Sequence, residues 1–174
     1  MKTLLHTLLI LLLLNLHHAI SAQPIPTPKK LTEFQFMIGD WQGSGTHYSQ
    51  QGIHSSDVSE SVKFALDSTI LVIQGTGFDQ NGVKQHDAFG ILYFENGNYY
   101  MHAFTMQGSQ VIANVVISGD QAIDWGFELP NGGKINYSAS FKDGLWKESG
   151  TYTTPDGGQS FPTIDMSFSR RYWV

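Results

Sequence analysis

Residues 133–153, with the sequence GKINYSASFKDGLWKESGTYT, carry the clearest β-hairpin pattern in this chain. In the first half of this stretch, an apolar side chain occupies every second position. Successive side chains of a β-strand point to opposite faces, so this alternation predicts a strand with one buried face. Asp143 and Gly144 follow as a two-residue turn signal, and a second strand pattern begins directly after them. We expect a hairpin whose inner face carries Ile135, Tyr137, Ala139 and Phe141.

The same pattern of short strands and turns extends in both directions from this hairpin. Turn signals recur at short, even intervals between residues 51 and 158, and β-branched and aromatic residues fill the intervals. A meander without room for crossover helices closes into a barrel or curls into two packed sheets. The expected fold is all-β: a single antiparallel up-and-down barrel of about 8–10 strands, with a short helical turn over 31–37 before the first strand. We predict strands near 41–48, 55–66, 69–77, 85–94, 98–106, 110–118, 122–129, 133–142, 144–153 and 163–173.

The first residues have the pattern of a secretory signal peptide. Lys2 is followed by an apolar run over 8–14 and by small or tolerated residues that end at Ser21 and Ala22. We expect cleavage near Ser21 and Ala22, and therefore a periplasmic or extracellular protein. The apolar run is well short of the roughly 20 residues of a membrane-spanning helix, so no membrane anchor is expected. The predicted parts are a signal peptide (1–22), a proline-rich leader (23–32) and a barrel domain (33–174).

Composition excludes several classes of protein. The 174-residue chain has no cysteine, 10 basic and 15 acidic side chains, and a formal net charge of −5. Without cysteine there is neither a disulfide framework nor a residue to carry a lipoprotein anchor. The basic side chains are scattered, whereas phosphate binding needs a clustered basic face, so nucleic acid is not an expected partner. Composition leaves the oligomeric state and the identity of any ligand open.

Residues 34–41, FQFMIGDW, combine a short helical turn with Gly39-x-Trp41 at the start of the first strand. This resembles the opening signature of the calycin superfamily, which includes the lipocalins and, more loosely, the nitrobindin-type barrels. The resemblance implies that Trp41 closes one end of the barrel and that an arginine of the last strand lies across its ring. Arg170 is preferred over Arg171, because Arg170 is in phase with the apolar face of that strand.

Two further sequence features indicate which calycin-like family the chain resembles. Gly43 and Gly45 follow the tryptophan, and the string HDAFGILY occupies residues 86–93. Together with the opening signature, they make the chain similar to a bacterial family of exported calycin-like proteins of unknown function (DUF1579-like). That resemblance implies a fold but supplies no activity.

Glu60 violates the pattern of its strand, because it shares the inward face with Val58, Val62 and Phe64. A carboxylate inside a barrel costs several kcal/mol unless it is paired or hydrogen-bonded, so we expect a partner. The partner is a ligand, water at the barrel mouth, or a side chain such as Lys63 or Arg170. His47 also has an inward phase, and Gln74 has one if Ile70 and Val72 do. These two residues of the neighbouring strands are the first candidates for a hydrogen bond to the Glu60 carboxyl group. A few polar groups on an apolar wall are typical of a small-molecule site, so Glu60, His47, Gln74, Tyr100, His102 and Tyr137 are the predicted ligand contacts.

Two alternatives to a binding barrel for an apolar or aromatic molecule stay open. His102, on one face with Tyr100 and Phe104, would serve as an axial ligand in a haem-binding or redox barrel. A lumen filled with side chains would instead indicate a structural or interaction domain. No histidines have metal-site spacing, and no cysteine or G-x-S-x-G nucleophile is present, so neither a metal site nor catalytic residues are predicted.

Overall fold

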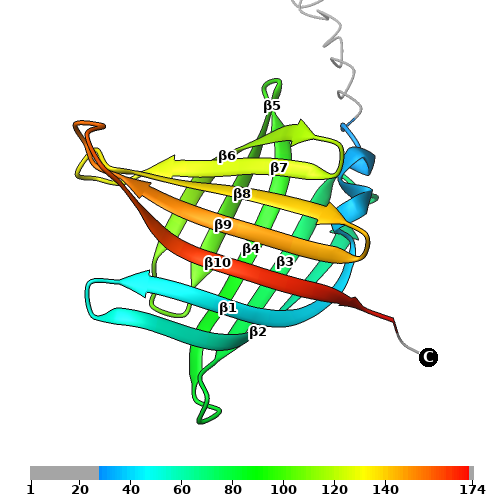
Figure 1. Ribbon diagram of the computed structural model, residues 1–174. Coiled ribbons are helices and arrows are strands. Elements are labelled where there is room, and N and C mark those ends of the chain that lie inside the picture. The colour runs from blue at the N-terminus through cyan, green and yellow to red at the C-terminus, as the bar shows by residue number, and fades with distance from the viewer. Residues whose placement is uncertain (1–27, 173–174) are drawn as a thin grey trace, which may run out of the picture.

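The computed structural model describes residues 28–172, which form one closed β-barrel (Figure 1). A 3-10 helix, η1 (Thr32–Met37), precedes ten antiparallel strands within these residues. Each strand pairs with its sequence neighbours, and the first pairs with the last to close the ring, so the predicted all-β up-and-down barrel is confirmed. The strands are β1 (Gly39–Ser49), β2 (Gly52–Ala65), β3 (Ile70–Phe78), β4 (Lys84–Glu95), β5 (Asn98–Thr105), β6 (Gln110–Gly119), β7 (Ala122–Glu128), β8 (Lys134–Lys142), β9 (Leu145–Thr153) and β10 (Ser160–Arg171).

The predicted signal peptide (1–22) and the first half of the predicted leader lie outside the described residues. The last leader residues are part of the fold. Leu31 is fully buried, and its amide donates a hydrogen bond of 2.7 Å to the carbonyl oxygen of Ser68. The packed core therefore begins before residue 33. In the region 28–172, no helix has the length and apolar character needed to cross a membrane.

The hairpin turns follow from the residues that the sequence places in them. Asp143 (φ 55°) and Gly144 (φ 72°) both adopt the left-handed conformation, which a two-residue type I′ turn requires. Asn96 (φ 49°) and Gly97 (φ 87°) do the same between β4 and β5. Side chains along each strand alternate between the lumen and the outer surface because the strand is pleated. The tight turns fix the register in which neighbouring strands pair.

Helix η1 lies against one end of the barrel (Figure 1), which we call the closed end. Phe34 and Met37 of η1 are buried there together with Trp41. The Trp41 Nε1 donates to the Met37 carbonyl oxygen over 2.9 Å, and the Arg170 guanidinium lies 4.5 Å from the centre of the Trp41 ring. Arg170 also donates from Nη2 to the carbonyl oxygen of Phe36 over 2.7 Å. This is the arrangement that the calycin resemblance implies for Trp41 and the last strand.

Gly39 begins the first strand beside Arg170. Its φ of 143° is one that residues with a side chain rarely adopt. A Cβ at this position would lie 3.4 Å from the Arg170 Nε, which is close to ordinary van der Waals contact. The backbone conformation, more than the neighbouring arginine, therefore favours a glycine at this position.

Candidate functional site

The inner wall of the barrel changes along its axis. Near η1, the inward side chains of Trp41, Val62 and Leu71 are at most 1 % exposed. Toward the other end, which we call the open half, four large inward side chains are only half-buried: Trp125, Tyr137, His47 and His86. Solvent therefore reaches these four side chains, whereas the closed end is filled with buried side chains.

Glu148 of β9 is the most deeply buried acid of the open half, with 5 % of its surface exposed. Two indoles hold its carboxyl group. Trp125 donates from Nε1 to Oε1 over 3.2 Å, and Trp146 donates from Nε1 to Oε2 over 3.0 Å. Burial raises the pKa of Glu148 to about 7, although the two indole hydrogen bonds oppose the shift.

Glu60 of β2 faces the same lumen, as its alternation predicts. Its carboxyl group lies over Gly75, where a Cβ would come within 2.2 Å of Oε1, so the glycine provides the space for this group. Burial raises the pKa of Glu60 to about 8, and the charge of Glu148 adds to the shift. Within residues 28–172, no side-chain hydrogen bond or ion pair reaches this carboxyl group.

The two side chains expected beside Glu60 have other positions. Gln74 is exposed on the outer face of β3, because Leu71 and Ile73 are the inward residues of that strand, so its expected inward orientation is wrong. His47 does face inward, but its Nε2 lies 3.1 Å from the hydroxyl oxygen of Ser56. The expectation that either residue is the hydrogen-bond partner of Glu60 is therefore also wrong.

An aromatic pair stands beside the carboxyl groups. The rings of Trp125 and Tyr137 stack with centroids 3.9 Å apart and an interplanar angle of 15°. The Tyr137 ring also packs over Gly150, where a Cβ would come within 2.6 Å of the ring. Burial, and next the nearby Glu148, raises the pKa of Tyr137 to about 12, so the phenol stays protonated. Tyr137 therefore occupies the inner position that the sequence predicts.

Two histidines face the lumen in the open half. Burial is the main cause that lowers the pKa of His47 and the pKa of His86. The nearby His54 lowers the pKa of His47 further, and His47 lowers the pKa of His86, which Asp87 opposes. Both rings therefore favour the neutral form. No group of three or more His, Cys, Asp or Glu side chains in the described region is arranged to hold a metal ion.

Tyr100 and His102 do not line the lumen. Met101 is the buried neighbour on β5, so Tyr100 and His102 lie on the outer face, and the expectation that they contribute to a lumen site is wrong. The His102 ring packs 4.3 Å from the Phe104 ring, and its Nε2 lies 3.3 Å from Gln110 Oε1. This arrangement gives no support to an internal haem held by His102.

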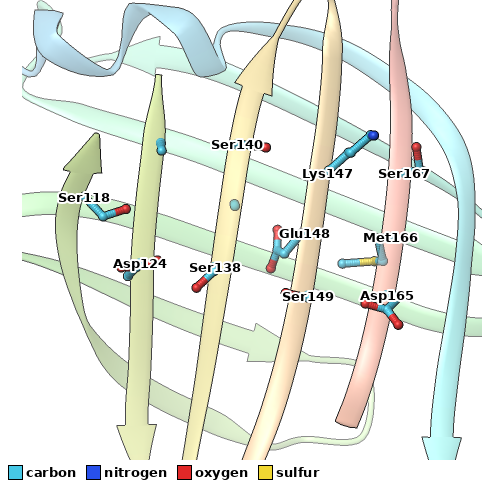
Figure 2. Close-up of a pocket in the computed structure, with 12 residues that line it drawn as sticks. Ser118, Asp124, Ser138, Ser140, Lys147, Glu148, Ser149, Asp165, Met166 and Ser167 are labelled. Atoms are coloured by element: carbon cyan, nitrogen blue, oxygen red, sulfur yellow. The ribbon is translucent and has the colours of Figure 1, made fainter. Parts of the chain in front are cut away.

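A depression of about 460 Å³ crosses the outer face of β6 to β10 (Figure 2). Five of its twelve lining residues are serines, four are charged, and none is aromatic. Glu148 contributes to its floor, but the carboxyl group is committed to the two indoles on the inner side. We therefore place the candidate site in the lumen. The outer depression is lined by Ser118, Ala122, Asp124, Ser138, Ala139, Ser140, Lys147, Glu148, Ser149, Asp165, Met166 and Ser167.

The sequence reasoning missed Glu148, Trp125 and Trp146. A usable signal was present in β9, because Trp146, Glu148 and Gly150 occupy alternate positions and share the inner face. An acid in phase with a tryptophan is the same anomaly that identified Glu60. The geometry thus brings together Glu60, Tyr137, Glu148 and Trp125, with His47 and His86 farther toward the open end.

Comparisons with known proteins show the fold. No protein-family model matches the chain, and no curated protein matches it. Rv2717c from M. tuberculosis is similar in structure, with a TM-score of 0.63 and 11 % identity over 82 % of this chain and 97 % of that one. The S-type phycobiliprotein lyase CPES from Guillardia theta has a TM-score of 0.57 and 10 % identity, over 84 % and 95 % of the two chains.

A third solved structure is a DUF3598-family protein of unknown function from Nostoc punctiforme, with a TM-score of 0.57 and 9 % identity. The match covers 84 % of this chain and 53 % of that one. These similarities, with the closed barrel of ten strands, show a calycin-like barrel fold.

Proposed function

We propose that this protein is an exported barrel that binds a small aromatic molecule in the open half of its lumen. The observation that carries the proposal is the stacked pair of Trp125 and Tyr137, half-buried on the inner wall beside the carboxyl group of Glu148. A large, rigid aromatic surface that solvent reaches, next to a few placed polar groups, has the composition of a small-molecule site.

The fold and the first residues of the chain support two further parts of the proposal. One barrel with the same fold is named a phycobiliprotein lyase, so a protein with this fold acts on another molecule. This supports a binding role for the present barrel. The signal-peptide pattern over 1–22 supports export to the periplasm or the outside of the cell. The resemblance of 34–41 and 86–93 to exported DUF1579-like proteins supports membership of such a family.

Native mass spectrometry of the protein purified from its own host tests the binding function. We expect a non-covalent adduct with the mass of a small molecule. The adduct should disappear in Tyr137→Ala and persist in Tyr100→Ala, since Tyr100 is a half-buried tyrosine on the outer face. Only the bare mass in a folded sample, or an adduct that both variants retain equally, would contradict the proposal.

A further inference from the structure

The two lumen carboxyl groups lack a cationic partner in the described part of the chain. Its seven lysines, at positions 29, 30, 63, 84, 134, 142 and 147, are all exposed. Arg170 is the arginine that faces inward, and its guanidinium group is engaged at the closed end by the Trp41 ring and the Phe36 carbonyl oxygen. Glu60 and Glu148 therefore share one low-dielectric region without a protein cation.

We infer that the lumen site takes an organic cation, such as an aromatic amine or a quaternary ammonium compound, held between Glu60, Glu148 and the Trp125–Tyr137 pair. The inference rests on the proposed binding function and names the chemical class of its ligand. It follows from two carboxyl groups and a stacked aromatic pair that face the same lumen, Glu60 from β2 and the others from β7 to β9.

Each group has a distinct part in this recognition. The indoles of Trp125 and Trp146 fix the orientation of the Glu148 carboxyl group, and their N–H groups leave its remaining lone pairs available. The Glu60 carboxyl group makes no side-chain hydrogen bond in residues 28–172, so it is free to approach a ligand. Aromatic faces attract cations, and most strongly where water is excluded.

Binding of a cation should release protons. The carboxyl groups are partly protonated near neutral pH because burial raises the pKa of both, and the charge of Glu148 raises the pKa of Glu60 further. A bound cation stabilises the ionised forms, so affinity should increase as the pH rises from about 6 to about 8. The other titratable groups on the facing strands are Tyr137, which stays protonated, and His47 and His86, which favour the neutral form.

The test compares phenyltrimethylammonium with tert-butylbenzene, its neutral isostere, by tryptophan fluorescence and titration calorimetry at pH 8. The cation should bind at least about tenfold more tightly than the isostere. Glu60→Gln should remove most of this preference, whereas Glu95→Gln, at an exposed position on β4, should leave it unchanged. Calorimetry of the wild-type protein in two buffers of different ionisation enthalpy should show proton release with the cation alone.

The outcomes separate this inference from the proposed function. If tert-butylbenzene binds as tightly as the cation, or if binding of the cation releases no proton, the inference is overturned while a lumen site for small molecules stands. If neither probe binds, the inference also fails, and native mass spectrometry decides on the binding function. A cation preference that Glu60→Gln leaves intact would place the cation elsewhere and overturn the assignment.

Discussion

The two ends of the barrel use tryptophan in opposite ways. At the closed end, Trp41 is 1 % exposed, and its indole N–H is satisfied by the backbone of η1. In the open half, Trp125 is half-buried, and its N–H holds a carboxyl group that faces the lumen. One indole completes a core, while the other orients an acid. The comparison separates residues that stabilise the fold from residues that are available to a ligand.

Two glycines of the barrel also differ in what they leave room for: one makes room for backbone and the other for a side chain. A Cβ on Gly43 of β1 would lie 1.9 Å from the backbone carbonyl oxygen of Ser167, so this glycine permits close approach of two strands. A Cβ on Gly75 of β3 would meet the far end of a side chain, the Oε1 of Glu60 at 2.2 Å. Gly43 is therefore required by the backbone, and Gly75 is required by the position of one carboxyl group.

The largest expected effect is that of Trp41→Ala. Removing a fully buried tryptophan costs about 3–5 kcal/mol of the free energy of unfolding, and here it also removes the surface on which Arg170 lies. Trp125→Ala should cost clearly less, since its ring is half-buried, but it should abolish ligand binding. Urea unfolding of both variants measures the difference. Equal losses of stability would mean that the two ends do not differ as we describe.

The glycine pair gives the next largest effect. Gly43→Ala should lower the free energy of unfolding by about 1–3 kcal/mol or more, because backbone atoms must move. Gly75→Ala should change stability much less, because the Glu60 side chain can rotate away, but it should weaken binding of a ligand that uses Glu60. Thermal unfolding and probe titration of the two variants provide the measurement. A severe loss of stability in Gly75→Ala would assign Glu60 to the fold.

The smallest expected effect is a dependence of stability on pH. The folded-state pKa values of Glu60, about 8, and of Glu148, about 7, lie above the ordinary 4.5. Carboxyl groups with raised pKa values stabilise the fold while protonated, so this contribution is lost as the pH rises toward 8. The lowered pKa values of His47 and His86 act oppositely, with stability lost as the pH falls below about 6.5.

The interval from pH 7 to pH 8.5 therefore isolates the carboxyl groups. We expect the melting temperature of the ligand-free protein to fall over this interval, and we expect Glu60→Gln to flatten the slope. Glu95→Gln is the matched control, because its side chain is exposed. An identical slope in wild type and Glu60→Gln would show that Glu60 is ionised and solvated in the folded protein.

Alternation in the sequence predicted the orientation of a residue wherever only one face of the strand is apolar. It placed Tyr137 and Glu60 correctly, because polar residues mark the outer faces of β8 and β2. It failed for Gln74 on β3, where Ile70 and Val72 are outward-facing apolar residues, so the two faces look alike.

The same difficulty affects β5. Its outer face carries Tyr100, His102 and Phe104 and continues across neighbouring strands, where Phe89 is 39 % and Ile112 is 57 % exposed. An apolar outer face removes the contrast on which the alternation rule depends. For β5, the orientation of the side chains therefore becomes clear only in the folded barrel, where the strand pairs with β4 and β6.

The most direct test of the account is an NMR titration of the glutamate side-chain carboxyl carbons, with Glu60 and Glu148 assigned from their Gln variants. We expect both groups to titrate near pH 7–8 in the ligand-free protein. Saturating phenyltrimethylammonium should shift both titrations to lower pH. Titration of both groups near pH 4.5 in the free protein, or midpoints that the cation leaves unchanged, would contradict a lumen site built on two buried carboxyl groups.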